Sequence, residues 1–261
     1  MTSASVRAET VGPVRLIRLT GVPKRGNPLS CALMRDVLDA VRAAEEDDDI
    51  RCLGILGTPT HFSVGADIDE MIDKSAIDWA QSRWMDDWDT LRAARKPIVA
   101  GVRGHAVGGG FELALLCDMI VCAEDARLAL PETALGVIPG TGGGQRLITL
   151  CGRAVAADMI LTGRVLDGRE ARELGIAARA VPSEKVEDEV VAIGRAVAER
   201  SPTAVAFARE VLRHASDGPI AQSLRIERLL AYLVFDTDDR RKRMADFLAA
   251  KGKARQVPGK G

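Results

Sequence analysis

Residues 96–118 read KPIVAGVRGHAVGGGFELALLCD, a stretch with the pattern of a strand, a turn and a helix. The apolar run over 97–102 fits a buried strand, and the three glycines at 108–110 open the next segment. An apolar helix is expected from about Gly109, followed by a second buried strand over 119–122. A strand, a helix and another buried strand predict a parallel crossover unit.

A second unit of this kind lies upstream. It consists of an alternating run over 14–19, a helix that Ser30 can cap, and a short apolar strand over 52–56. Between the two units, residues 76–94 carry apolar side chains at the spacing of one helix face. The recurrence of the unit predicts an α/β fold.

Beyond residue 141 the pattern is mostly helical, with one short strand expected over 178–181. No repeat of solenoid period interrupts it. We therefore expect an α/β core in residues 1–200 and a helical C-terminal region in residues 201–261, with helices near 202–214, 219–234 and 238–250.

The composition excludes several classes of function. The 261 residues include 36 Lys and Arg against 37 Asp and Glu, a net charge of −1, and only 3% aromatic residues, so a nucleic-acid partner is not expected. No apolar stretch is long enough to span a bilayer, so no membrane partner is expected either. Because the amino terminus lacks the apolar centre of a signal peptide, we expect a cytoplasmic protein.

The cysteines and histidines do not form a metal-binding pattern. The five cysteines include no CxxC pair and lie in apolar segments, which indicates reduced core residues. The three histidines show no ligand spacing. We therefore expect no metal site.

The glycines at 108–110 remove every Cβ from a helix entrance, where backbone N–H groups are unpaired and the helix dipole is positive. An electronegative group could bind there, although tight helix packing would also explain the glycines. Glu112 lies three residues after Gly109 and shares its helix face, so its carboxyl could project over that group. Alternatively, Glu112 only stabilises the helix dipole, by about 0.3–1 kcal/mol.

A second glycine turn, at Gly65 in HFSVGADIDEM, also follows a buried strand. Amides from the two turns could converge on one carbonyl oxygen. Downstream, Glu132 follows Pro131 at a constrained bend, where it could be catalytic or could cap a helix or form a salt bridge. The hydrolase motif GxSxG is absent, so Ser63 is not expected to be a nucleophile.

Three segments together resemble the signature regions of the crotonase, or enoyl-CoA hydratase/isomerase, superfamily. They are VGADIDEM at 64–71, KPIVAGVRGHAVGGGFELALLCD at 96–118 and LALPETALGVIPGTGGGQRL at 128–147. The resemblance extends over nearly the whole chain. It implies a crotonase-like ββα spiral core, a helical C-terminal trimerisation region, and a homotrimer or a dimer of trimers.

The resemblance also implies the site. Backbone N–H groups of Ala66 and Gly109 would form an oxyanion hole for a thioester carbonyl, with Glu112 activating water and Glu132 supplying the α-proton. The substrate would be an acyl-CoA thioester, with no separate cofactor. Having both carboxyls favours an enoyl-CoA hydratase over an isomerase or another crotonase-type acyl-CoA lyase, and a non-catalytic CoA-thioester or RNA-binding relative is a further alternative.

Coenzyme A contacts follow from the same resemblance. Its phosphates would lie near Lys24 and Arg25 and, from a neighbouring subunit, Lys251. Trp88, with Trp84 and Met85, either lines the acyl pocket or belongs to the core. The remaining substrate contacts are expected from Gly108 and from the backbone of Val64, Gly65, Ala66, Asp67 and Ile68.

The sequence departs from the family pattern at two positions. Gly144 stands where hydratases usually have threonine, and we expect it to touch the loop that supports Glu132. Pro28 stands where alanine commonly follows the asparagine. A Gly109→Val change should block the oxyanion hole, and Gly108→Ala should be milder if the Gly108 amide faces away.

Overall fold

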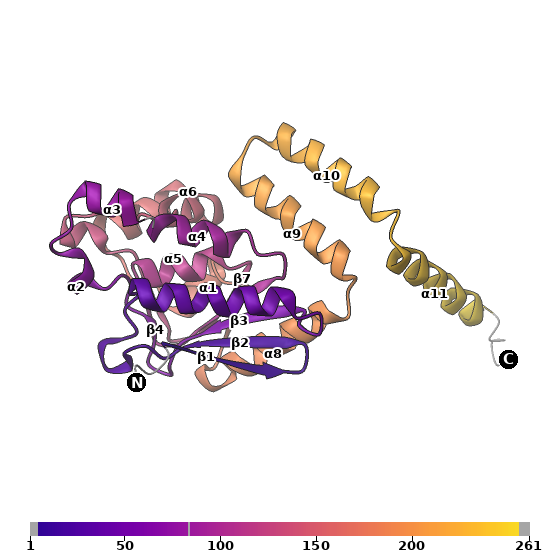
Figure 1. Cartoon of the computed structure of the whole chain (residues 1–261), viewed down its shortest axis with the longest axis horizontal. Coiled ribbons are helices and arrows are strands. Elements are labelled where there is room, and N and C mark those ends of the chain that lie inside the picture. The colour runs from indigo at the N-terminus through magenta and orange to yellow at the C-terminus, as the bar shows by residue number, and fades with distance from the viewer. Residues whose placement is uncertain (1–4, 83, 256–261) are drawn as a thin grey trace. The chain divides into compact units, whose positions relative to one another are not determined.

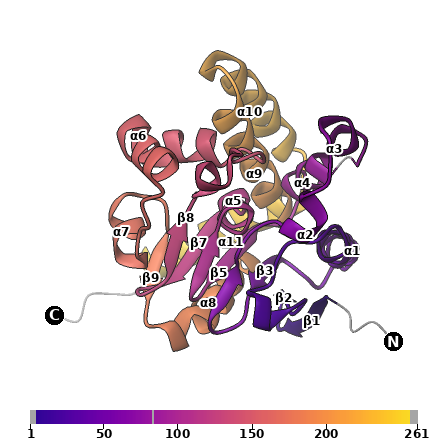
Figure 2. The ribbon, with the colours of Figure 1, turned by 90° about the vertical axis from the view of Figure 1, so that its left-hand side faces the viewer.

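The computed structural model describes residues 5–82 and 84–255 and divides the chain into two compact units, Met1–Ala198 and Glu199–Gly261. The first unit is built on a large sheet with the order β1-β2-β3-β5-β7-β9 (Figures 1 and 2). Only β1 is antiparallel to its neighbour. The strands are Val6–Val11, Val14–Leu19, Cys52–Leu56, Ile98–Val102, Met119–Ala123 and Arg179–Val181.

A second, three-stranded parallel sheet has the order β4-β6-β8. Its strands are His61–Ser63, His105–Val107 and Arg127–Ala129, and each follows directly after a strand of the large sheet. Each crossover therefore adds one strand to each sheet before a helical segment begins. This repeated strand, strand and helix pattern is the ββα spiral that the resemblance implied.

Helix α8 (Val186–Ala198) covers one face of the large sheet, and α5 (Gly109–Leu116) lies on the other (Figure 2). Glycines allow the close approach of α8. A Cβ built on Gly54 would lie 2.7 Å from Val190 Cγ1, and one built on Gly101 would lie 3.0 Å from Val190 Cγ2. Because any larger side chain would separate the layers, these glycines set the distance between helix and sheet.

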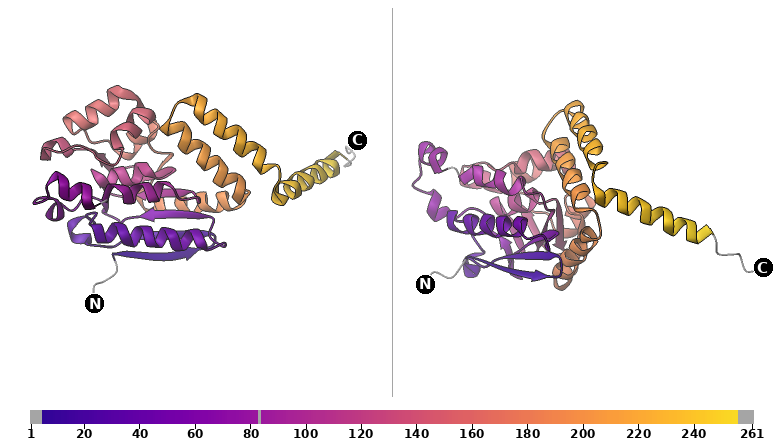
Figure 3. Two further views of the ribbon diagram at one scale, coloured as in Figure 1. Left: turned by 45° about the horizontal axis from the view of Figure 1, so that its top comes forward. Right: turned by 45° about the vertical axis from the view of Figure 1, so that its right-hand side comes forward.

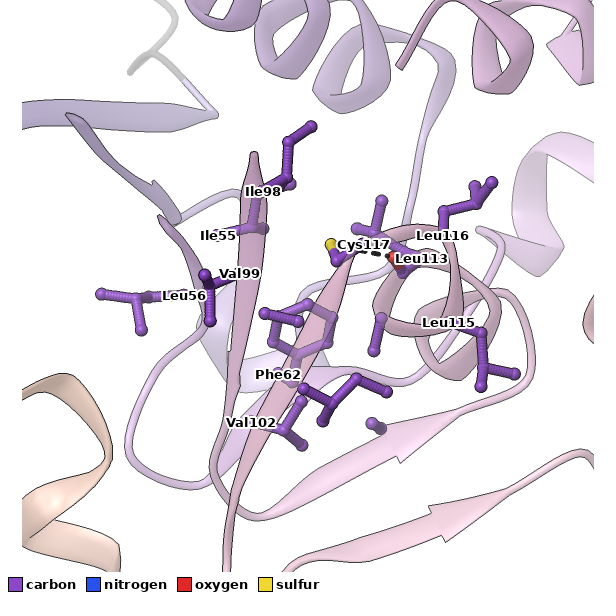
Figure 4. Packing of buried hydrophobic residues seen from close by; sticks show 14 of the residues in the cluster. Ile55, Leu56, Phe62, Ile98, Val99, Val102, Leu113, Leu115, Leu116 and Cys117 are labelled. Atoms are coloured by element: carbon purple, nitrogen blue, oxygen red, sulfur yellow. Dashed lines mark hydrogen bonds between the residues drawn. The ribbon is translucent and has the colours of Figure 1, made fainter. Parts of the chain in front are cut away.

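The core is continuous through the first unit. Phe62 of β4 is fully buried between β5 and α5, as Figure 4 shows. In the same region the Cys117 thiol donates to Leu113 O at 3.4 Å. All five cysteines are free thiols, three of them buried and two half-buried. Cys52, Cys117 and Cys122 therefore lie in the core, as predicted.

Helix α1 (Cys31–Glu46) begins as predicted, because Ser30 Oγ accepts the N–H of Leu33 at 3.1 Å. The helix expected over 76–94 corresponds to α3 (Ala76–Ser82) and α4 (Trp84–Arg92), which lie on either side of residue 83, outside the described residues. The other elements of this unit are η1 (Pro23–Arg25), α2 (Ile68–Met71), η2 (Glu132–Leu135), α6 (Gly143–Thr162), α7 (Gly168–Glu173) and η3 (Ser183–Lys185).

The second unit is helical, as predicted. It consists of α9 (Pro202–Asp217), α10 (Ile220–Val234) and α11 (Asp238–Arg255), and α9 and α10 run side by side (Figures 1 and 3). Among the described residues, no helix is both long enough and apolar enough to cross a membrane.

Candidate active site

The first glycine turn is held by a short parallel pairing between residues 26–29 and 64–67. Leu29 N–H donates to Gly65 O at 2.7 Å, and Asp67 N–H donates to Leu29 O at 3.2 Å. These two hydrogen bonds flank Ala66. The N–H of Ala66 therefore faces away from Leu29 and stays available for another acceptor.

The amides of Ala66 and Gly109 lie close to each other. A Cβ built on Gly109 would lie 3.4 Å from Ala66 N, and one built on Gly65 would lie 3.1 Å from Gly109 N. Within residues 5–82 and 84–255, no acceptor is found for either N–H. The structure thus brings together the two turns that the sequence pointed to, with both donors unoccupied.

Ser63 stabilises the first glycine turn through hydrogen bonds, a role that the sequence did not predict. Its side chain is fully buried, and its Oγ donates to Asn27 O at 2.7 Å and accepts Gly65 N–H at 3.1 Å. Asn27 itself has the left-handed φ of +56°. The Ser63 hydroxyl therefore stabilises the turn that carries Ala66. This structural role agrees with the expectation that Ser63 is not a nucleophile.

Glu112, on α5, is 3% exposed and is held by backbone donors. Its Oε1 accepts the N–H of Thr141 and the N–H of Gly143, both at 2.9 Å. A Cβ on Gly143 would lie 2.8 Å from Glu112 Cγ. Residues 140–143, here called the glycine loop, thus fit closely around this carboxyl.

The glycine loop corrects the expectation for Gly144. Its described side-chain contacts go to Glu112 rather than Glu132, because the N–H groups at the start of α6 point toward α5. A Cβ on Gly144 would instead lie 3.4 Å from Ile160 Cδ1, later in α6. Ile160 in turn accepts a hydrogen bond from Thr133, the neighbour of Glu132, at 3.0 Å. Pro28, the other departure, is buried.

Glu132 begins η2 directly after Pro131. A Cβ on Gly108 would lie 3.2 Å from Glu132 Oε1, and both carboxyl oxygens are buried without a hydrogen-bond partner among the described residues. Burial raises the pKa of Glu132 from 4.5 to about 7, and the charge of Glu112 contributes in the same direction. Near neutral pH this carboxyl is therefore protonated in a substantial fraction of molecules.

Comparison with known proteins decides the family. A family model described as enoyl-CoA hydratase/isomerase matches residues 9–255. The chain belongs to this family. A probable enoyl-CoA hydratase of Rhizobium meliloti is 37% identical over 96% of this chain and 97% of the relative. A mitochondrial enoyl-CoA hydratase of Pongo abelii is 35% identical over 92% of this chain and 81% of the relative.

Solved structures agree. An enoyl-CoA hydratase subunit I of Geobacillus kaustophilus superposes with a TM-score of 0.91 at 36% identity, covering 96% of this chain and 97% of that one. The crotonase-like α/β fold class predicted from the sequence is therefore confirmed. The enoyl-CoA hydratase/isomerase family is enzymatic, so the chain is an enzyme of it.

Of the three basic residues that the family resemblance assigned to coenzyme A, Arg25 already forms ion pairs within the chain. The Arg25 guanidinium bonds to Asp67 at 3.1 Å and to Asp69 at 2.7 Å. Lys24 is exposed, and no ion pair is found for it in the described part of the chain. Lys251 is exposed on α11, in the second unit. The geometry therefore favours Lys24 over Arg25 as a free cation for a phosphate.

Two of the three tryptophans lie in the core. Trp84 and Trp88 are 5% and 2% exposed, with ring centroids 5.1 Å apart in an edge contact. Met85, which is 43% exposed, reaches the glycine loop, where a Cβ on Gly140 would lie 2.8 Å from its Cε. Of the two alternatives for Trp88, the structure matches the core residue, and Met85 is the side chain of this helix that approaches the site.

The backbone segment over residues 64–68, from which the family resemblance predicted substrate contacts, forms the first glycine turn. Val64 is 37% exposed and Ile68 is 51% exposed, so this edge of the site is open and apolar. The described residues contain no group of His, Cys, Asp and Glu that could hold a metal ion.

Proposed function

We propose that this enzyme is an enoyl-CoA hydratase, which adds water across the double bond of a 2-enoyl-CoA thioester. The observation that carries the proposal is the contrast between two carboxyls beside one pair of free amides. Glu112 Oε1 accepts two backbone N–H groups, whereas both oxygens of Glu132 are buried without a partner. Unlike carboxyl environments in one site are typical of a separate base and acid.

The free amides of Ala66 and Gly109 would hold the thioester oxygen. Addition of water to the β-carbon builds enolate charge on that oxygen, and this charge is absent from the ground-state thioester. Fixed N–H donors need no reorganisation, and each contributes roughly 2.7–4 kcal/mol in measured oxyanion holes.

The two carboxyls divide the proton transfers. Glu112 takes a proton from water as the water oxygen bonds to the β-carbon, and the π electrons move to form the enolate. Glu132 then donates its proton to the α-carbon, and the proton on Glu112 returns to Glu132 through solvent. The pKa of Glu132, about 7, keeps that proton available near neutral pH.

An isomerase is the second candidate, and Glu132 is the observation that favours it. A single carboxyl with two unpartnered oxygens could move a proton between the α- and γ-carbons. The two activities differ in their need for Glu112, because an isomerase adds no water.

Turnover assays separate these activities. We expect hydration of crotonyl-CoA, followed by loss of the enoyl-thioester absorbance, and no reaction of free crotonic acid. A 3-enoyl-CoA tests for isomerisation, and a dicarboxylic enoyl-CoA belongs in the panel because an Escherichia coli relative, 35% identical over 87% of this chain, is named 2,3-dehydroadipyl-CoA hydratase. Isomerisation without hydration by the wild type, unaffected by Glu112→Gln, would contradict the hydratase proposal.

We further propose that coenzyme A is part of the substrate and that no separate cofactor is used. We also propose a homotrimer or a dimer of trimers in the cytoplasm. Exposed apolar side chains on α10, among them Leu229, Tyr232 and Leu233, support self-association. Light scattering on the purified full chain tests it, and a monomer at micromolar concentration would refute it.

A further inference from the structure

We propose that the hydroxyl of Thr141 hydrogen-bonds the oxygen that adds to the substrate. That oxygen belongs to water before the addition and to the 3-hydroxyl of the thioester afterwards. The inference rests on the proposed hydratase function and adds a residue to the same site.

The backbone of Thr141 is fixed on both sides. Its N–H donates to Glu112 Oε1 at 2.9 Å, and its carbonyl accepts from Arg146 Nη1 at 2.7 Å. The next residue, Gly142, has a left-handed φ of +93°, and a Cβ there would lie 2.3 Å from Arg146 Nη1. The Thr141 side chain is therefore carried by a rigid segment of the glycine loop.

The hydroxyl of Thr141 lacks a partner, unlike other threonines in this part of the chain. Its Oγ1 is buried and has no hydrogen-bond partner among the described residues. By contrast, Thr133 donates to Ile160 O at 3.0 Å, and Thr149 donates to Gln145 O at 3.1 Å. Because a buried hydroxyl without a partner is unfavourable, a partner from outside the chain is expected.

The distance to Glu112 suits a bridging oxygen. Covalent geometry keeps a threonine Oγ1 within roughly 4 Å of its own nitrogen. The nitrogen of Thr141 lies 2.9 Å from Glu112 Oε1. The hydroxyl and the carboxyl are therefore close neighbours, and one water with two hydrogen bonds of about 2.8 Å each bridges groups up to about 5.6 Å apart.

The chemistry of a hydroxyl fits this place. It can donate to a lone pair of the water while Glu112 accepts the proton of the same water, so the two groups together would orient the attacking oxygen. After addition, the same hydroxyl can bond to the 3-hydroxyl of the product. A saturated thioester offers no oxygen at that carbon and cannot use it.

The test compares binding of 3-hydroxybutyryl-CoA and butyryl-CoA by calorimetry. Thr141→Val keeps the shape and removes the hydroxyl, and Thr141→Ser keeps the hydroxyl. Thr149→Val is the matched control, since it removes a threonine hydroxyl from the exposed side of α6. We expect Thr141→Val to weaken 3-hydroxybutyryl-CoA by about threefold to tenfold relative to butyryl-CoA, with the ratio preserved in the other two variants.

Hydration kinetics give a second readout. We expect Thr141→Val to lower kcat for crotonyl-CoA by a similar factor while leaving KM nearly unchanged, because the lost contact is to water rather than to the thioester. An unchanged binding ratio in Thr141→Val overturns the inference, and a raised Tm with that unchanged ratio would show a hydroxyl that is simply unsatisfied. If the wild type hydrates no enoyl-CoA, the hydratase proposal fails, and the binding ratio still decides the role of Thr141.

Discussion

The carboxyl of Glu132 lies against the α-carbon of Gly108, so that a Cβ built on Gly108 would stand 3.2 Å from Glu132 Oε1. Gly108 directly precedes Gly109, whose amide faces the first glycine turn. One short segment of chain therefore separates the proposed acid from the proposed oxyanion hole. A substitution at one of these positions can therefore shift the position of the other.

Gly109→Val tests the oxyanion hole. A Cβ there would lie 3.4 Å from Ala66 N, so the valine methyl groups would fill the space between the two amides. We expect a folded protein whose hydration rate falls by roughly 10²–10³. Circular dichroism and turnover are measured together, and a folded, fully active variant would remove Gly109 from the mechanism.

Gly108→Ala is the natural comparison in that experiment. The Gly108 N–H donates to Ala129 O at 2.9 Å and so faces away from the hole, which on its own predicts a mild effect. However, Gly108 has φ +55° and ψ −131°, a conformation that suits glycine. The milder outcome expected from the sequence is therefore replaced by an expectation of both lower Tm and lower activity.

Glu132→Gln removes the proposed acid. We expect hydration to fall by about 10²–10⁴ with thioester binding retained. In the wild type, kcat/KM should fall as pH rises through about 7, because Glu132 must be protonated to donate. A pH profile that stays flat from 6 to 8.5 in the wild type would argue against this role.

The same pKa shift predicts how stability depends on pH. With a pKa raised from 4.5 to about 7, the folded protein binds more protons at Glu132 than the unfolded chain between these values. This group's contribution to stability is thus lost as pH rises through that window. Urea unfolding should show Glu132→Gln gaining stability relative to the wild type between pH 4.5 and pH 8, and a constant difference would be inconsistent with the shift.

Glu112→Gln separates the catalytic role of the Glu112 carboxyl from its role as a hydrogen-bond acceptor for the glycine loop. Glutamine keeps a carbonyl oxygen that can accept the N–H groups of Thr141 and Gly143, so Tm should change little while hydration falls by at least about 10². Glu112→Ala leaves both donors buried and unpaired and should lower stability by about 2–4 kcal/mol. Thermal melts of both variants, with turnover, check this, and equal stability of the two would contradict the assigned support.

Lys24→Ala and Arg25→Ala should differ in their effect on coenzyme A. Arg25 is paired with Asp67 and Asp69, whereas Lys24 is exposed without an ion pair in the described chain. We expect Lys24→Ala to weaken CoA binding by about two- to fivefold at low salt, and Arg25→Ala to change it less. Calorimetry at two salt concentrations tests this, and the reverse order would return the phosphate to Arg25.

Much of the fold could be predicted because its signals are long. The strand over 98–102 is a continuous apolar run. The helix after Ser30 has apolar residues at helical spacing and a serine that caps its start. The strands β6 and β8 were not predicted, because three residues are too few to show an alternation.

The site was only partly accessible from the sequence. Glycine turns and glutamates at fixed spacing pointed to Ala66, Gly109, Glu112 and Glu132, and the structure gathers them. Which loop supports which carboxyl was not predictable, because the contact between Thr141 and Glu112 joins residues from different crossovers. The hydrogen bond between Ser63 and Asn27 was not predictable either, because these residues lie far apart in the sequence.

The pairing of Leu29 with Ala66 has a consequence for how the protein acquires its activity. Ala66, Gly109 and Glu132 come from three successive crossovers, so the site is complete only after all three have docked. Helices can form early from local contacts, whereas such distant contacts form late. During refolding, recovery of thioester binding should therefore lag behind recovery of circular dichroism. Simultaneous recovery of both signals would show that the three crossovers dock in a single step. A lag would make ligand binding a stringent measure of completed folding.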